Sequence, residues 1–221
     1  VSYLLKACYG EKKNSWVAYD SSYCALLPRN ENSYAIEGAV NMLSNTGGLK
    51  TSGVDFELNY SVPLNFGVFG AKTGKLSFRA AGTRLINYTL NPIGSISELR
   101  QDCAGKFGIN CGDPYSKLRL NNRITWSSGP ITLGLTHRYL SSVRDDDDDN
   151  TYSVEKIKAY NLFDLGLQVQ ATETFGWSLG MNNMFNKKPP IMGDNQQQSN
   201  TYPSTYDVYG RAFFVNASVK F

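Results

Sequence analysis

Histidine is scarce and long hydrophobic runs are missing. The single histidine among 221 residues excludes a histidine-rich metal centre. No apolar run approaches the roughly 18–20 residues that a membrane-spanning helix needs. This does not exclude a membrane protein, because a transmembrane barrel places its lipid-facing side chains at alternate positions. A targeting leader is also missing at Val1, Ser2 and Tyr3, so we expect a chain that is processed, cut or part of a longer one.

Catalytic signatures are missing as well. The sequence has no nucleophile elbow and no phosphate-binding glycine loop. We therefore expect no enzymatic activity and no cofactor. Charge of neither sign dominates, because 22 Lys+Arg face 19 Asp+Glu and the net charge is +3. A balance of this kind gives no reason to expect a nucleic-acid partner.

Strand-forming and loop-forming residues are plentiful, with 14 Tyr, 11 Phe and 20 Gly. The clearest strand lies at residues 54–62, where apolar and polar side chains alternate. One face carries Val54, Phe56, Leu58, Tyr60 and Val62, and the other carries Asp55, Glu57, Asn59 and Ser61. A strand that separates lipid from a water-filled lumen needs these two faces.

The same alternation predicts seven strands in all. They are Leu49–Val62, Lys75–Leu90, Lys117–Trp126, Ile131–Val143, Tyr160–Ala171, Phe175–Asn186 and Arg211–Phe221. Short turns and long loops alternate between them, and aromatic residues gather beside the short turns. This sorting is typical of an antiparallel transmembrane β-barrel, an all-β fold. The alternative is a secreted soluble β-sandwich, such as a carbohydrate-binding module.

The four cysteines form two local pairs, Cys8 with Cys24 and Cys103 with Cys111. Neither pair has the C-x-x-C spacing of a zinc site. We expect two loop-closing disulfides and therefore an oxidising compartment. The alternative is four free thiols in a cytosolic protein. The acidic run Asp145–Asp149 lacks the glycine of a calcium loop, and like-charge runs are usually solvated, so we expect no metal there.

Several segments resemble one known family, the TonB-dependent outer-membrane receptors. Leu49–Asp55 is similar to the family's "kT-GvD" strand. Cys103–Cys111, followed by Lys117–Arg119, is similar to a disulfide loop that enters a strand. Asn182–Pro190 resembles the family's "N-LF-kkPP" penultimate strand, and the terminal Phe221 also fits. The resemblance covers nearly the whole chain.

The resemblance implies that residues 1–221 are the last seven strands, about the C-terminal third, of a 22-stranded barrel in the outer membrane of a Gram-negative cell. Extracellular loops are then expected at about residues 1–33, 91–116, 144–159 and 187–210. It further implies TonB-dependent uptake of a bulky nutrient such as a siderophore, a cobalamin or an oligosaccharide. The implied partners are a plug absent from this chain, the TonB complex reached through that plug, and lipid or lipopolysaccharide.

Four arginines lie on the expected lumen face: Arg79, Arg119, Arg123 and Arg138. They are our candidates for contact with an anionic ligand or with the acidic face of a plug. The alternative, which we favour, is that they neutralise Asp55, Glu57 and Asp164 across the lumen.

Seven strands cannot close into an antiparallel barrel. An odd number of antiparallel strands begins and ends in the same direction, so closure would need a parallel pair. We therefore expect an upstream segment or a second polypeptide to supply the plug and an odd number of strands, about fifteen if the family count holds. Val1 would then lie in an extracellular loop.

Overall fold

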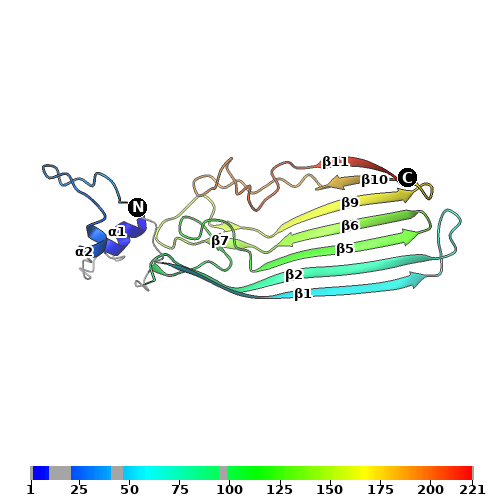
Figure 1. Cartoon of the computed structure of the whole chain (residues 1–221), viewed down its shortest axis with the longest axis horizontal. Helices are drawn as coiled ribbons and strands as arrows, with labels where there is room; N and C mark the ends of the chain where they lie inside the picture. Colours follow the sequence, from blue (N-terminus) through cyan, green and yellow to red (C-terminus); the bar gives the residue numbers. More distant parts are fainter. Residues whose placement is uncertain (1, 10–20, 41–46, 95–98, 221) are drawn as a thin grey trace. The chain divides into compact units, whose positions relative to one another are not determined.

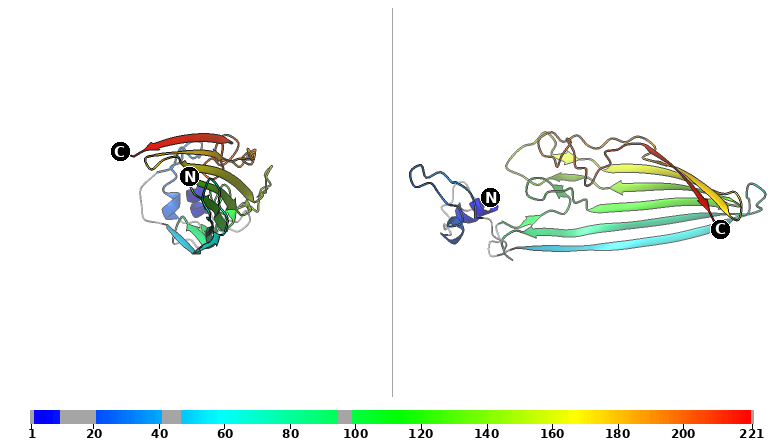
Figure 2. Two further views of the ribbon diagram at one scale, coloured as in Figure 1. Left: turned by 90° about the vertical axis from the view of Figure 1, so that its right-hand side faces the viewer. Right: turned by 45° about the horizontal axis from the view of Figure 1, so that its top comes forward.

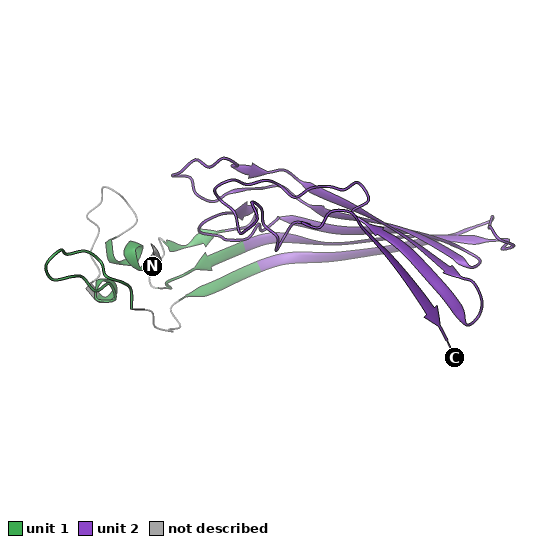
Figure 3. Ribbon diagram, turned by 90° about the horizontal axis from the view of Figure 1, so that it is seen from above, with its two compact units in different colours: residues 1–51, 88–102 green, residues 52–87, 103–221 purple. Residues whose placement is uncertain are grey.

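The computed structural model describes residues 2–9, 21–40, 47–94 and 99–220. It divides into two compact units (Figure 3). Unit 1 comprises Val1–Thr51 and Tyr88–Asp102, and unit 2 comprises Ser52–Asn87 and Cys103–Phe221. The end of the predicted terminal strand, Phe221, lies outside the described residues.

Unit 1 contains two short helices, α1 (Ser2–Tyr9) and α2 (Ser21–Cys24), joined by the Cys8–Cys24 disulfide. Ala7, Ile93 and Leu99 form its small buried core. Within this unit, β3 (Gln101–Asp102) pairs with the end of β2 (Gly74–Asn91). None of the described helices is long and apolar enough to cross a membrane.

Most of unit 2 is one antiparallel sheet whose long strands are neighbours in chain order (Figure 1). These strands are β1 (Gly48–Leu64), β2, β5 (Leu118–Ser128), β6 (Ile131–Leu140), β9 (Tyr160–Gln170), β10 (Phe175–Asn182) and β11 (Ala212–Val219). Seen end-on, the strands form a curved wall (Figure 2). The sheet order leaves β1 and β11 as its two edges.

The seven predicted strands are confirmed: most boundaries shift by one or two residues, and two are corrected by more. The strand expected over Ile131–Val143 ends at Leu140, and Val143 begins the separate short strand β7 (Val143–Asp145). The strand expected over Phe175–Asn186 ends at Asn182. It stops there because Asn183 adopts a left-handed backbone with φ of 50°, which cannot continue an extended strand.

Cross-strand pairing keeps the two predicted faces separate. Phe78, Ile124, Leu135 and Leu165 follow one another across β2, β5, β6 and β9. The next row on the opposite face has Arg79, Arg123, Thr136 and Asp164. The apolar face is uncovered, since Leu58 is 56% exposed and Val215 is 72% exposed. A soluble sandwich would bury this face in its core, so the exposure favours a lipid-facing wall.

The long connections at one end of the sheet contain structure that the sequence patterns missed. Segments expected to be plain loops hold a second, three-stranded sheet made of β4 (Lys106–Phe107), β7 and β8 (Lys156–Ile157). β4 and β7 run parallel, whereas β7 and β8 run antiparallel. Strands of two or three residues are too short to show a period, so alternation could not reveal them.

Candidate ligand-binding wall and loops

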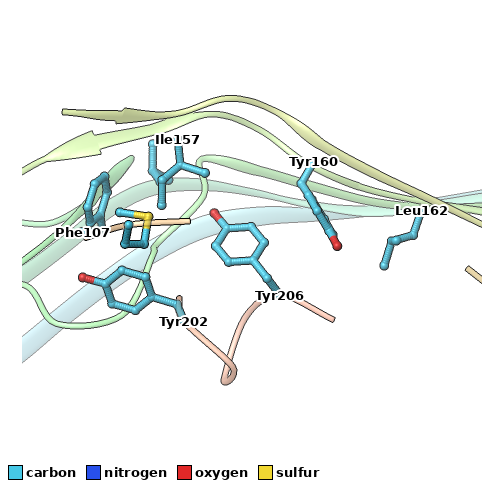
Figure 4. Close-up of a cluster of buried hydrophobic side chains, with 8 residues drawn as sticks. Phe107, Ile157, Tyr160, Leu162, Tyr202 and Tyr206 are labelled. Carbon is cyan, nitrogen blue, oxygen red and sulfur yellow. The ribbon is translucent and has the colours of Figure 1, made fainter. Parts of the chain in front are cut away.

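Three long connections of unit 2 fold together over a buried core (Figure 4). Phe107 comes from the loop that follows β3, Ile157 from the loop that follows β6, and Tyr202 and Tyr206 from the loop that follows β10. Tyr160 and Leu162, at the start of β9, complete the cluster with Val143 and Met192. Phe107 and Tyr202 meet edge to face with ring centroids 5.7 Å apart. The loops therefore form one packed body, which we call the loop body, on the end of the wall.

The disulfide loop is attached to the loop body through Asp146. Cys103 and Cys111 are bridged, as the sequence predicts. The Asp146 carboxylate accepts hydrogen bonds from the backbone N–H groups of Asn110 and Cys111. Asp146 is 6% exposed, and this burial raises the pKa of its carboxyl above the ordinary value.

The acidic run is therefore only partly solvated, and the expectation of a fully solvated run was wrong for its first two members. Asp145 is also buried, which raises its pKa, and its carboxylate accepts hydrogen bonds from Asn195 and from the Asp147 backbone. A hydrogen bond from Asn150 lowers the pKa of Asp147. Within the described residues, no group of three or more histidines, cysteines and acids could hold a metal ion.

Two of the four candidate arginines form ion pairs with lumen-facing acids. Arg138 binds Asp164 through two hydrogen bonds of 2.8 and 2.9 Å, and Nε of Arg79 lies 3.1 Å from Glu57. Glu57 and Asp164 thus have arginine partners on the same wall rather than across the lumen, whereas Asp55 accepts a hydrogen bond from the Thr83 hydroxyl.

The other two arginines donate to neutral oxygens. Arg123 donates to the hydroxyls of Thr125 and Thr136 and lies against Gly134, where a Cβ would be only 2.6 Å from Nη2 of the arginine. Arg119 donates a long hydrogen bond, 3.5 Å, to the carbonyl of Pro114. Among the four arginines, Arg119 makes the weakest of these polar contacts. Its guanidinium group is therefore the one most available to bind a ligand.

A cavity of about 610 Å³ opens where the lumen face meets the loop body. Arg119, Asn121 and Arg138 line it from the wall, whereas Tyr206 and Tyr209 line it from the loop that follows β10. The Tyr206 phenol is neutral near pH 7, as phenols ordinarily are, and burial raises its pKa further. Tyr209 is 92% exposed. The cavity thus combines guanidinium, amide and phenol groups with aromatic surface, a mixture suited to a large polar ligand.

Asn183 fastens the loop that follows β10 to the wall. Its backbone N–H donates to Asp164 at 2.8 Å, and its side-chain amide donates to the Lys187 carbonyl at 2.9 Å and to Asp207 at 3.1 Å. The Lys187 N–H donates back to Oδ1 of Asn183 at 2.7 Å. Asp207 also lines the cavity. Asn183, only 1% exposed, thus links the ion-paired wall to the cavity rim.

The sequence patterns selected Arg119 and Arg138, which both line this cavity. They selected none of the residues that line it from the loop that follows β10. Tyr206, Asp207 and Tyr209 lie in a polar segment without a period, so nothing local marked them. Asn183 was visible only as part of a family-like motif. The signal that could have identified it is the Asn-Asn pair at the end of a strand, because asparagine tolerates the left-handed backbone that ends strands.

The model of the family described as "TonB dependent receptor-like, beta-barrel" matches residues 18–184. The chain belongs to this family. Members of the family are outer-membrane transporters. No curated protein matches the chain.

Two solved structures are also similar, both of variants of the ferric enterobactin receptor PfeA from Pseudomonas aeruginosa. Each has 14% sequence identity, a TM-score of 0.40 and coverage of 76% of this chain. The chain spans 31% of the length of these receptors.

Proposed function

We propose that this chain forms part of the wall and the outer loops of an outer-membrane receptor for TonB-dependent uptake of a bulky nutrient. The long loops are extracellular in this proposal, and the short turns are periplasmic. The remaining strands of the same receptor pair with the edges β1 and β11, because unpaired edge groups in lipid would each cost several kcal/mol. The upstream part of the receptor also supplies the plug.

The observation that carries the proposal is the cavity between the lumen wall and the loop body. A receptor must hold its nutrient on the outside before it is moved, and this cavity lies where extracellular loops meet the lumen. Siderophores, cobalamins and oligosaccharides all present several polar groups, and the lining of Arg119, Asn121 and Tyr206 offers both donors and acceptors for them.

Binding to the full receptor tests the proposal. Ferric siderophores, cobalamin and oligosaccharides would be screened by their effect on intrinsic fluorescence, first with the native receptor and then with Arg119→Ala. We expect one class to bind, and binding to weaken by about tenfold in the variant, the scale of one lost charged hydrogen bond. Arg79→Ala, which removes the ion pair with Glu57 away from this cavity, is the matched control and should bind as the native protein does. Equal binding by native protein and Arg119→Ala would contradict this placement of the site.

The family match argues against the alternative of a secreted β-sandwich module, and solubility gives an independent check. A monodisperse soluble monomer recovered without detergent would favour the sandwich and exclude the barrel. The exposed apolar face of the sheet leads us to expect aggregation under those conditions.

A further inference from the structure

Asn122 of β5 is a polar residue on the apolar, outward face of the wall. It follows Ile124 on that face and lies directly opposite His137 of β6, the neighbouring strand (Figure 1). By contrast, the paired residues on the same face of β10 and β11 are all apolar: Phe175, Trp177, Leu179, Met181, Phe213, Val215, Ala217 and Val219. The wall thus carries an amide on β5, on a face that is purely apolar at its far edge.

The hydrogen bonds of Asn122 use only part of its amide. Nδ2 of Asn122 lies 3.3 Å from Nδ1 of His137, and Nε2 of His137 lies 2.9 Å from Oδ1 of Asn161. Because an amide nitrogen can only donate, Nδ1 accepts, and the proton of the neutral ring lies on Nε2. Within the described part of the chain, Oδ1 of Asn122 accepts no hydrogen bond. The amide therefore keeps one acceptor oxygen and its second N–H hydrogen for another partner.

This amide lies near the middle of the expected apolar band. Trp126, near the short-turn end of the same strand, belongs to the aromatic residues expected at the membrane interface. At a rise of about 3.4 Å per residue and a tilt of about 40°, Asn122 lies roughly 10 Å above Trp126, within a band about 25 Å tall. Lipid hydrocarbon offers no hydrogen-bonding group at this depth. An amide with an unused donor and acceptor is costly there, so its position points to a contact with protein.

A second copy of the wall supplies the groups that this amide needs. A twofold axis along the membrane normal places every residue of one copy at the same depth as the same residue of the other. Asn122 then meets its own counterpart. Two such amides satisfy each other through a pair of N–H···O hydrogen bonds, because each has one donor and one acceptor available. A different protein would need its own donor and acceptor at this same depth.

The residues around Asn122 suit contact with such a copy. Ala80 lies opposite Asn122 on β2, and a small residue at this place lets a neighbouring wall approach closely. Phe78 and Ile124, paired with each other one step nearer the short turns, are 36% and 46% exposed. In the facing copies these side chains cover one another and exchange contacts with lipid for contacts with protein. The imidazole of His137 is stacked on Phe163, with ring centroids 4.6 Å apart, and holds the amide in place.

We propose that the full receptor forms a homodimer whose twofold axis passes beside Asn122. The outward faces of β5 and β6 meet in this dimer, and the pair of Asn122 amides lies at the centre of the interface. The proposal rests on the proposed function, because that function places the wall in a membrane.

Sedimentation equilibrium of the full receptor in density-matched detergent tests the proposal, because it gives the dissociation constant of a dimer. Asn122→Leu should raise this constant by about tenfold, the scale of two hydrogen bonds between amides within a membrane. The variant should still insert, since leucine is apolar. Gln168→Leu is the matched control, because it makes a similar change on the lumen face of β9, and it should dimerise as the native protein does.

The possible outcomes separate the dimer from the proposed function. A native receptor that stays monomeric at every concentration, an equal dissociation constant for native protein and Asn122→Leu, or a different protein bound in place of the second copy would overturn the proposal. Nutrient binding is measured on the same samples and should be unchanged in Asn122→Leu, since this residue faces away from the lumen. A monomer that binds nutrient would contradict the dimer alone, whereas a dimer that binds no nutrient would contradict the proposed function.

Discussion

In the wall, apolar side chains such as Leu58 and Val215 point outward and stay exposed, whereas in the loop body Phe107 and Met192 point inward and are covered. The wall thus needs lipid to cover its apolar face, and its strands are held together by ladder hydrogen bonds. The loop body covers its own apolar groups, as a water-soluble domain does. One chain therefore contains two kinds of folded structure that should respond differently to substitution.

The largest expected effect is a loss of membrane insertion by the wall, with the loop body unchanged. Leu167 lies between Leu133 and Leu179 on the lipid face. Leu167→Arg should destabilise the inserted state by about 2–4 kcal/mol, because an arginine near the bilayer midplane loses its hydration. Assembly into the membrane would be followed by the heat-dependent mobility of the receptor on gels. Gln168→Arg is the control, since Gln168 faces the lumen, and equal effects at the two positions would refute the assignment of faces.

A second prediction concerns a substitution that should destabilise the loop body and leave the wall unchanged. Removing the disulfide with Cys103→Ser and Cys111→Ser should destabilise the loop body by about 2–3 kcal/mol, because the short loop gains freedom when it unfolds. The change should appear as faster proteolysis of residues near Asn110 and as lost protection of the β4 amides from hydrogen exchange. Insertion of the wall should be unchanged. Loss of insertion would show that the loop body and the wall fold as one unit.

A third prediction concerns the junction between the two regions. Asn183→Gly keeps the left-handed backbone available but removes the side-chain hydrogen bonds to Lys187 and Asp207, at a cost of about 1–3 kcal/mol. The loop that follows β10 should then detach from the wall, which hydrogen exchange at the Lys187 amide would detect. Ser199→Gly, at another left-handed position in the same loop, is the control. Retained protection of Lys187 would mean that the rest of the loop holds it in place.

The same comparison explains what the sequence could predict. Period-two alternation is local, so the face on which Phe78, Ile124 and Leu165 lie was readable from each strand separately, whereas their cross-strand register was not. The loop-body core joins Phe107, Val143 and Met192 from three distant segments, and no local pattern records such contacts. Asp146 looked like one acid in a solvated run, because its burial depends on the distant disulfide loop.

The smallest expected effect is a pH dependence of stability that the loop body should show and the wall should not. Burial raises the pKa of Asp145 and Asp146 above the ordinary value of 3.8, so the folded loop body holds these protons more tightly than the unfolded one. Their stabilisation is complete below pH 3.8 and is lost as the pH rises through the folded pKa, so the loop body should loosen from acidic toward neutral pH. Asp147 has a lowered pKa and acts with the opposite sign, but only below 3.8. Hydrogen-exchange protection of the Cys111 amide, corrected for the intrinsic exchange rate, would report the change.

Asp146→Asn makes this prediction specific. The amide keeps an oxygen that accepts the Cys111 hydrogen bond but cannot ionise, so the pH dependence above 3.8 should shrink to the share of Asp145. Asp147→Asn should leave most of that dependence, because burial is the largest cause of the raised pKa of both Asp145 and Asp146. Among the described residues of the wall, the outward face carries no such buried acid, so exchange at Leu167 should show no corresponding pH dependence. A slope that survives in Asp146→Asn with Asp145→Asn would assign the titration to other groups and would contradict the burial of these two carboxyls as its cause.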